Sequence, residues 1–147
     1  MALDIDFGRP LTIKEIEYCI PHRHPFLLID RVEDVVCHQY VIAKKCLSIF
    51  DCVFQGHFPE KPIYPGVLII EGMAQAASVL GFANRGKRHA VLTEVIKARF
   101  RHQAYPGDVL TYVLQQKCYR QGFYWFEGTA KVSNQLIASV TFSAMID

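Results

Sequence analysis

With 147 residues, of which 51% are apolar, the chain is long enough to bury the core of one domain without disulfides or metals. We therefore predict a single domain over residues 1–147. A formal net charge of +2 is too small by itself to indicate a nucleic-acid-binding protein.

The cysteines and the first residues indicate a cytoplasmic protein. Five cysteines form an odd set with no C-x-x-C pair, which is typical of free thiols in a reducing compartment. Asp4 and Asp6 stand where a secretory signal would need a basic start and an apolar run. We expect no export.

The N-terminal third is predicted to contain one short helix and two strands. Thr12 and Glu15 have the spacing of a capping box, which predicts a helix over residues 12–20. Two runs rich in Val, Ile and Leu predict antiparallel strands at 27–36 and 40–48.

A loop and a long helix are predicted next. Residues 55–66 hold three prolines and two glycines, which exclude regular structure. Residues 67–84 are apolar around nearly the whole circumference of a helix, which predicts a helix enclosed on all sides. A membrane span is the alternative, and three polar residues inside the segment disfavour it, namely Glu71, Gln75 and Ser78.

The C-terminal half is predicted to form four more strands. The strand at 89–101 should be half-buried, because near its end apolar residues alternate with basic ones: Ile96, Ala98 and Phe100 with Lys97, Arg99 and Arg101. The other three are expected at 109–119, 123–132 and 136–145. Hairpins around one enclosed helix predict an α+β domain, with the antiparallel sheet curled round the helix.

Basic residues gather between the long helix and the strand that follows it. The stretch from Arg85 to Arg101 contains six basic residues, with Glu94 as its only acidic residue. A solvated surface is the common explanation for such a run. The alternative is a docking site for an acidic partner.

Residues at the helix entrance could carry chemistry. Pro65 and Gly66 directly precede the long helix, so its first amides and the positive end of its dipole can receive a developing oxyanion. A plain helix start is the alternative. His57 stands between Gly56 and Pro59, where a fixed backbone can aim an imidazole at this entrance, although most loop histidines are only solvated.

A carboxyl group inside the long helix is the second candidate. Glu71 has apolar neighbours, where an ionised carboxylate is unfavourable unless it is paired, so the proton-donating acid form is favoured. Gln75, one turn later, can hold this carboxyl in place. A glutamate at the domain surface fits the sequence equally well. His22 and His24 have no third ligand nearby, so we interpret them as structural rather than metal-binding.

Several motifs occur together in one order along the chain. They are PHRHPFLLIDR at 21–31, FQGHFP at 54–59 and PGVLIIEGMAQ at 65–75, followed by KARF at 97–100 and PGD at 106–108. Over residues 12–145 the chain resembles the FabZ-type 3-hydroxyacyl-acyl carrier protein dehydratases. A coincidence of several motifs is far more specific than any one of them.

The resemblance implies the hot-dog fold, in which a curved antiparallel sheet wraps a long helix, and dehydration of 3-hydroxyacyl-acyl carrier protein to the trans-2-enoyl form in fatty acid biosynthesis. It implies that His57 takes the C2 proton, that Glu71 helps the C3 hydroxyl leave as water, and that the Gly66 amide binds the thioester carbonyl. It implies no metal and no organic cofactor.

The resemblance also implies partners. Members of the family form homodimers that share their active sites between two chains, often as trimers of dimers. Their acidic carrier protein docks on basic residues, for which Lys97, Arg99 and Arg101 are the candidates here. No nucleic acid and no membrane span is implied.

The chain departs from the family pattern at positions outside the pair His57 and Glu71. Phe50 and Asp51 replace an Asn-Glu pair, and Glu60, Gly72 and Ile96 replace Gly, Ala and Asp. These departures leave open the acyl chain length and a role in another acyl pathway.

Two other classes of function compete with dehydration. The first is an acyl thioesterase of the same fold, and the second is a non-catalytic module that binds acyl carrier protein or nucleic acid through the basic run. The chain has no G-x-S-x-G, G-x-G-x-x-G or G-x-x-x-x-G-K-[ST] motif. The set of His57, Gly66 and Glu71 favours dehydration over both alternatives.

Overall fold

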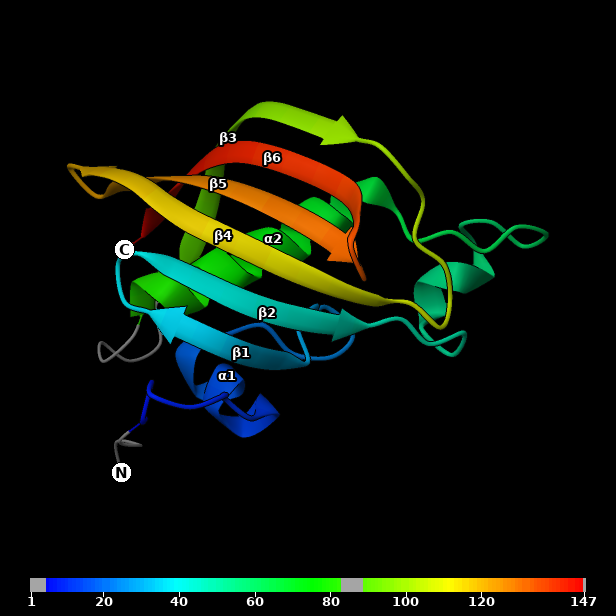
Figure 1. Cartoon of the computed structure of the whole chain (residues 1–147), viewed down its shortest axis with the longest axis horizontal. Coiled ribbons are helices and arrows are strands. Elements are labelled where there is room, and N and C mark those ends of the chain that lie inside the picture. Colours follow the sequence, from blue (N-terminus) through cyan, green and yellow to red (C-terminus); the bar gives the residue numbers. More distant parts are fainter. Residues whose placement is uncertain (1–4, 83–88, 147) are drawn as a thin grey trace.

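The computed structural model describes residues 5–82 and 89–146 (Figure 1). Helix α1 (Ile13–Cys19) begins at the predicted capping box, in which the Thr12 amide donates to Glu15 Oε2 over 2.8 Å. Arg9 donates to the other oxygen of Glu15 over 2.6 Å. These hydrogen bonds stabilise the first turn, and the helix predicted at 12–20 is confirmed.

Six strands form one antiparallel sheet in the order β1-β2-β4-β5-β6-β3. Their bounds are β1 (Arg31–Val36), β2 (Tyr40–Cys46), β3 (Ala90–Phe100), β4 (Val109–Arg120), β5 (Phe123–Val132) and β6 (Gln135–Ile146). Strands β1–β2, β4–β5 and β5–β6 are hairpins, whereas β3 pairs with β6 alone among the described strands and is an edge strand.

Helix α2 (Gly66–Phe82) lies along the concave side of this sheet (Figure 1). Met73, Ala76, Val79 and Leu80 of the helix are fully buried, and their burial against the sheet is the main source of stability for such a layered domain. The predicted α+β architecture, a sheet curled round one long helix, is confirmed. Among residues 5–82 and 89–146, no helix is long and apolar enough to cross a bilayer.

The helix is not enclosed on every side as the sequence predicted. Val67 is 71% exposed, and Ile70, Glu71 and Ala74 are only half-buried. The spacing of these four residues places them on one helical stripe. This stripe is the side of α2 that the chain's own sheet leaves open. Residues 83 and 84 of the predicted helix lie outside the described residues.

The first predicted strand begins too early. Residues 27–30 were expected in a strand, but β1 begins at Arg31. The Leu28 amide donates to Gln75 Oε1 over 2.8 Å, and the Phe26 carbonyl accepts from Gln75 Nε2 over 2.8 Å. Backbone groups that pair with a side chain of α2 are not available to a neighbouring strand, so this segment runs over the helix instead.

Strand β3 is exposed rather than half-buried. Ile96 and Phe100, which were expected to face the core, are 51% and 50% exposed, and Val91, Leu92 and Val95 are exposed as well. As an edge strand, β3 has one row of backbone groups unpaired among the described residues, and most of its apolar side chains are exposed. An apolar edge of this kind is a ready surface for another chain.

Gly72 makes room for a buried tyrosine. A Cβ atom at this position would lie 2.6 Å from the hydroxyl oxygen of Tyr112 and 2.8 Å from its Cζ. Tyr112, on β4, is fully buried, and burial raises the pKa of its hydroxyl well above the usual value. Glycine at position 72 is therefore matched to the phenol ring across the core.

Gly72→Ala should lower the melting temperature. The added methyl group overpacks the core, which costs about 1–3 kcal/mol and outweighs a gain in helix propensity of about 1 kcal/mol. In a Tyr112→Leu background the same change should be neutral or stabilising, because the clash is gone. A double-mutant cycle by thermal unfolding measures this coupling, and additive effects would contradict it.

Candidate active site

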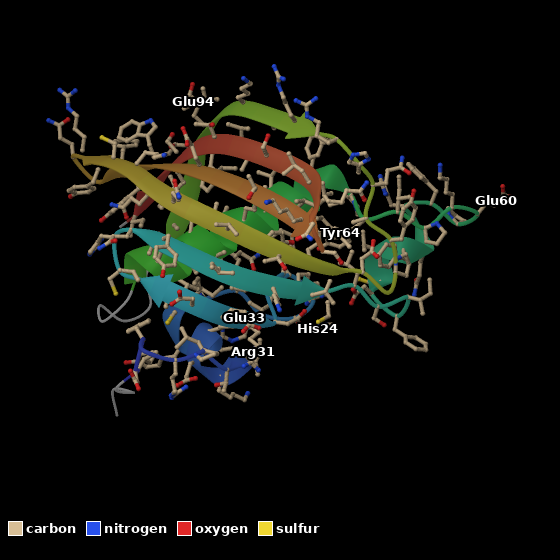
Figure 2. All side chains as sticks on the ribbon, viewed as in Figure 1. His24, Arg31, Glu33, Glu60, Tyr64 and Glu94 are labelled. Carbon is tan, nitrogen blue, oxygen red and sulfur yellow. The ribbon has the colours of Figure 1, made fainter. Side chains whose placement is uncertain are left out.

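His57 is held in a fixed orientation by its own loop. The loop follows the short 3-10 helix Cys52–Gln55 and ends at Pro65, and Figure 2 shows Glu60 at its outer tip. The His57 amide donates to the Val53 carbonyl over 3.0 Å, and the Ile63 amide donates to the His57 carbonyl over 3.1 Å. The imidazole stacks on Phe58, with 4.1 Å between ring centroids.

One contact decides which ring nitrogen of His57 can act as a base. Nδ1 lies 2.9 Å from the Ile63 carbonyl oxygen. Because a carbonyl only accepts, Nδ1 must carry the proton, and Nε2 of the neutral ring is left with its lone pair. A lone pair at Nε2 is what a general base requires.

The entrance of α2 lies beside this imidazole. The Pro65 carbonyl accepts from the Leu68 and Ile69 amides over 3.0 and 3.2 Å, so the first helical turn forms directly after Pro65. The amides of Gly66 and Val67 come before any partner that helix geometry could supply. A Cβ atom at Gly66 would lie 2.6 Å from the Phe100 ring, so only glycine fits under that ring without a shift.

His57 and Gly66 line one cavity of about 330 Å³. Its apolar walls come from Ile63, Tyr64, Pro65, Val67, Ile69 and Phe100, and His102 and Gln103 complete it. An imidazole with a lone pair and a helix amide without an intrahelical partner therefore meet at one largely apolar cavity. Glu71 is absent from the lining.

Glu71 lies in a second, smaller site on the same helix. Gln75 Nε2 donates to Glu71 Oε1 over 2.9 Å, and Gln75 is itself buried and held by the segment before β1. His22 Nε2 lies 3.5 Å from the same carboxylate oxygen. The Glu71 side chain is 24% exposed, which lies between the buried and surface alternatives that the sequence left open.

The structure therefore brings the predicted residues together in two groups. His57 and Gly66 share one cavity, whereas Glu71 and Gln75 line a different one of about 30 Å³ with His22. Within one chain, the predicted acid and the predicted base do not face a common cavity.

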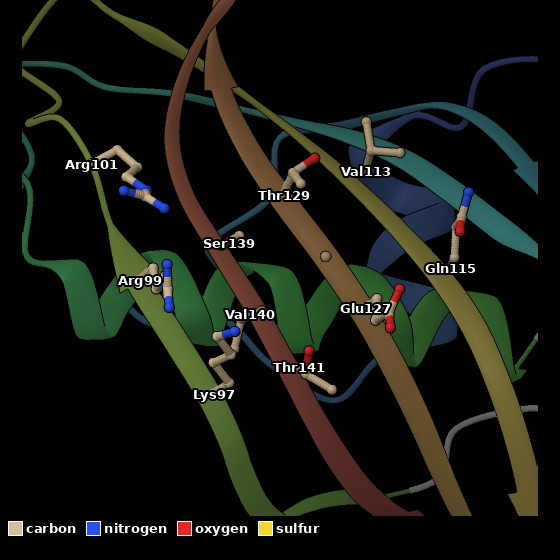
Figure 3. Close-up of a pocket in the computed structure, with 11 residues that line it drawn as sticks. Lys97, Arg99, Arg101, Val113, Gln115, Glu127, Thr129, Ser139, Val140 and Thr141 are labelled. Atoms are coloured by element: carbon tan, nitrogen blue, oxygen red, sulfur yellow. The ribbon is translucent and has the colours of Figure 1, made fainter.

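The three predicted docking residues lie together on the outer face of the sheet. Lys97 and Arg99 of β3, and Arg101 directly after it, line a groove of about 490 Å³, and Glu127 of β5 lies across from them (Figure 3). None of the three forms an ion pair with a carboxylate within the described part of the chain. Phe100 and His102, which alternate with them, line the His57 cavity instead. The other basic residues of the run, Arg85, Lys87 and Arg88, lie outside the described residues.

Comparisons with known proteins show the family. A family model described as a FabA-like domain matches residues 20–141. The 3-hydroxyacyl-[acyl-carrier-protein] dehydratase FabZ of Campylobacter curvus is 40% identical over 144 residues, which cover 92% of this chain and 97% of that protein. The chain belongs to the FabZ-type dehydratase family. Another member, from Nitratiruptor sp., is 43% identical and is covered to the same extents, 92% and 97%.

A solved structure agrees with the family fold. One chain of the dehydratase heterocomplex ApeI:P from Xenorhabdus doucetiae superposes with a TM-score of 0.78, at 21% identity and with 90% of both chains covered. At that identity the likeness concerns the fold alone. The predicted hot-dog fold is confirmed.

The sequence interpretation missed the contact between His22 and Glu71. It predicted structural rather than metal-binding roles for His22 and His24; the two side chains line different cavities, and His22 Nε2 lies 3.5 Å from Glu71 Oε1. The available signal was its place in the family motif PHRHPF.

Proposed function

We propose that the chain removes water from 3-hydroxyacyl thioesters carried on acyl carrier protein and forms trans-2-enoyl thioesters in fatty acid biosynthesis. Identity of 40% and 43% to FabZ dehydratases over nearly their whole length supports this activity. The structural observation that carries it is the fixed imidazole of His57, which has Nε2 free and shares a cavity with the Gly66 amide.

Each step of the reaction has a group in the chain. His57 Nε2 takes the proton from C2, and the electron pair left behind spreads onto the thioester carbonyl oxygen, which the Gly66 amide stabilises. The electrons return to form the C2–C3 double bond as the C3 hydroxyl leaves. Glu71 donates a proton to that hydroxyl, so water departs and His57 has gained the C2 proton.

The acid and the base come from two chains in this proposal. One copy contributes the His57 cavity, and a second copy contributes Glu71 with Gln75. The exposed apolar edge strand β3 supports the pairing, because two β3 strands related by a twofold axis would complete each other's hydrogen-bond ladder. The exposed stripe of α2 carries Glu71 and lies open to such a neighbour. We place the dimer in the cytoplasm, for which five free cysteines are additional support.

A turnover assay with a 3-hydroxyacyl thioester tests the reaction. Dehydration produces the absorbance of the conjugated enoyl thioester and releases no thiol. Free thiol without enoyl absorbance would instead identify an acyl thioesterase, and binding without turnover would identify a non-catalytic module. Either result would refute dehydration.

The groove formed by Lys97, Arg99 and Arg101 is the proposed docking site for the acidic carrier protein. The alternation from Lys97 to Arg101 puts these cations on the outer face, while neighbouring Phe100 lines the His57 cavity. A carrier bound there would contact the same strand, β3, whose Phe100 lines the cavity that receives its acyl chain. The cations would mainly speed and orient the encounter.

Charge reversal of Lys97, Arg99 and Arg101 to glutamate should raise KM for carrier-protein substrates far more than for a short pantetheine thioester. Added salt should have the same selective effect on the unmodified protein, because exposed charges are screened. Lys131→Glu, a charge change elsewhere on the outer face, is the matched control. Equal effects on KM for both substrates would show that the groove is only a solvated surface.

A further inference from the structure

Among the described residues, nitrogen atoms contact only one of the two carboxyl oxygens of Glu71. Gln75 Nε2 donates to Oε1 over 2.9 Å, and His22 Nε2 lies 3.5 Å from that same atom. Among the described residues, no hydrogen bond reaches Oε2. The two oxygens of this carboxyl are therefore in different chemical environments.

The position of His22 is fixed by the same residue that holds Glu71. His22 lies between α1 and β1, in the segment that crosses α2. Gln75 ties this segment to the helix at the Phe26 carbonyl and at the Leu28 amide, both over 2.8 Å. The His22 ring also stacks on Phe26, with 6.4 Å between centroids. His22 thus reaches Glu71 from a well-anchored backbone.

The surroundings of His22 select one protonation state. Nδ1 is buried and has no hydrogen-bond partner. Burial lowers the pKa of His22 from its ordinary 6.5; Arg23 and His89 act in the same direction, and Glu71 opposes them. In the neutral ring, a proton on Nδ1 would leave a buried donor unpaired, whereas a proton on Nε2 stands on the nitrogen that lies 3.5 Å from Glu71 Oε1.

We propose that His22 is a positioning residue that, together with Gln75, holds Oε1 of Glu71 and so leaves Oε2 as the oxygen that carries the catalytic proton. An oxygen that accepts from Gln75 and faces His22 Nε2 at 3.5 Å cannot also present an O–H along the same directions. The acid proton then lies on Oε2, the oxygen for which neither contact is formed. This inference rests on the proposed function, in which Glu71 is the proton donor.

Kinetics of three variants test the role in turnover. His22→Phe keeps the ring volume and removes the donor, so kcat should fall about twofold to tenfold, as for a lost hydrogen bond between neutral groups, with KM little changed. His22→Gln keeps a donor and should retain most of kcat. His24→Phe, at an exposed residue that lines a different cavity, is the matched control and should leave kcat unchanged.

Nitrogen NMR of the histidine rings tests the contact without any turnover. The signals of His22 are those lost in His22→Gln. We expect them to show the neutral tautomer protonated at Nε2, and we expect Glu71→Gln to move the Nε2 resonance because it replaces the facing carboxyl group by an amide. These NMR measurements can be made whether or not the protein dehydrates a substrate. A failure of the proposed function can therefore be distinguished from a failure of this inference.

Several outcomes would overturn the inference. They are a tautomer protonated at Nδ1, an Nε2 resonance that ignores Glu71→Gln, and a folded His22→Phe variant with wild-type kcat. Equal losses in His22→Phe and His22→Gln would also overturn it, because they would show that the shape of the ring, and not its donor, is required.

Discussion

His57→Ala and Glu71→Gln should each lower kcat for a 3-hydroxyacyl thioester by about a hundredfold to ten-thousandfold, the usual contribution of a general acid or base. The His57 ring is half-exposed in its loop, and glutamine has nearly the shape of glutamate. Neither change removes much packing, so both variants should unfold at close to the wild-type temperature.

The control for this pair is His38→Asn. His38 lies in the turn between β1 and β2, outside the lining of the His57 cavity, and has a positive φ of 60°, which asparagine tolerates. This variant should keep wild-type kcat. Steady-state kinetics on purified, folded samples test both roles. A near wild-type rate in either variant would show that the substituted residue does not have its assigned role.

The order of helices and strands along the chain could be predicted from local patterns, because each element buries side chains at a regular spacing. The apolar circumference of residues 67–84 predicted α2, and the observed strand β5 coincides with the predicted 123–132. Errors arose where the backbone pairs with a distant side chain. The segment before β1 failed as a strand because Gln75, 47 residues beyond Leu28, takes its hydrogen bonds.

From the sequence, the residues of the candidate site could be predicted only where they stand in recognisable motifs. His57, Gly66 and Glu71 stand in recognisable motifs, but their separation into two cavities depends on the path of the chain in space. The burial of Ile96 and Phe100 was predicted from alternation alone, which does not distinguish a central strand from an edge strand. His22 was missed because its contact with Glu71 joins residues 49 positions apart in the chain.

Two nearly inactive variants should regain activity when they are refolded together. If each site takes His57 from one chain and Glu71 from the other, a dimer of one His57→Ala chain and one Glu71→Gln chain has one site with both lesions and one with neither. Random pairing gives about half mixed dimers, each with one intact site of two, so recovery should approach roughly a quarter of wild-type activity by counting over a twofold interface.

The rescue should depend on exchange of subunits. Mixing the two variants without unfolding should restore activity slowly, at the rate at which dimers dissociate, because the apolar β3 edge would be buried in each dimer. Two tags, one on each variant, allow the mixed dimers to be isolated and counted. If His57 and Glu71 of one site belonged to the same chain, every site would carry one lesion whichever chains paired. Isolated mixed dimers without activity would therefore refute the shared site and leave the dehydratase assignment standing.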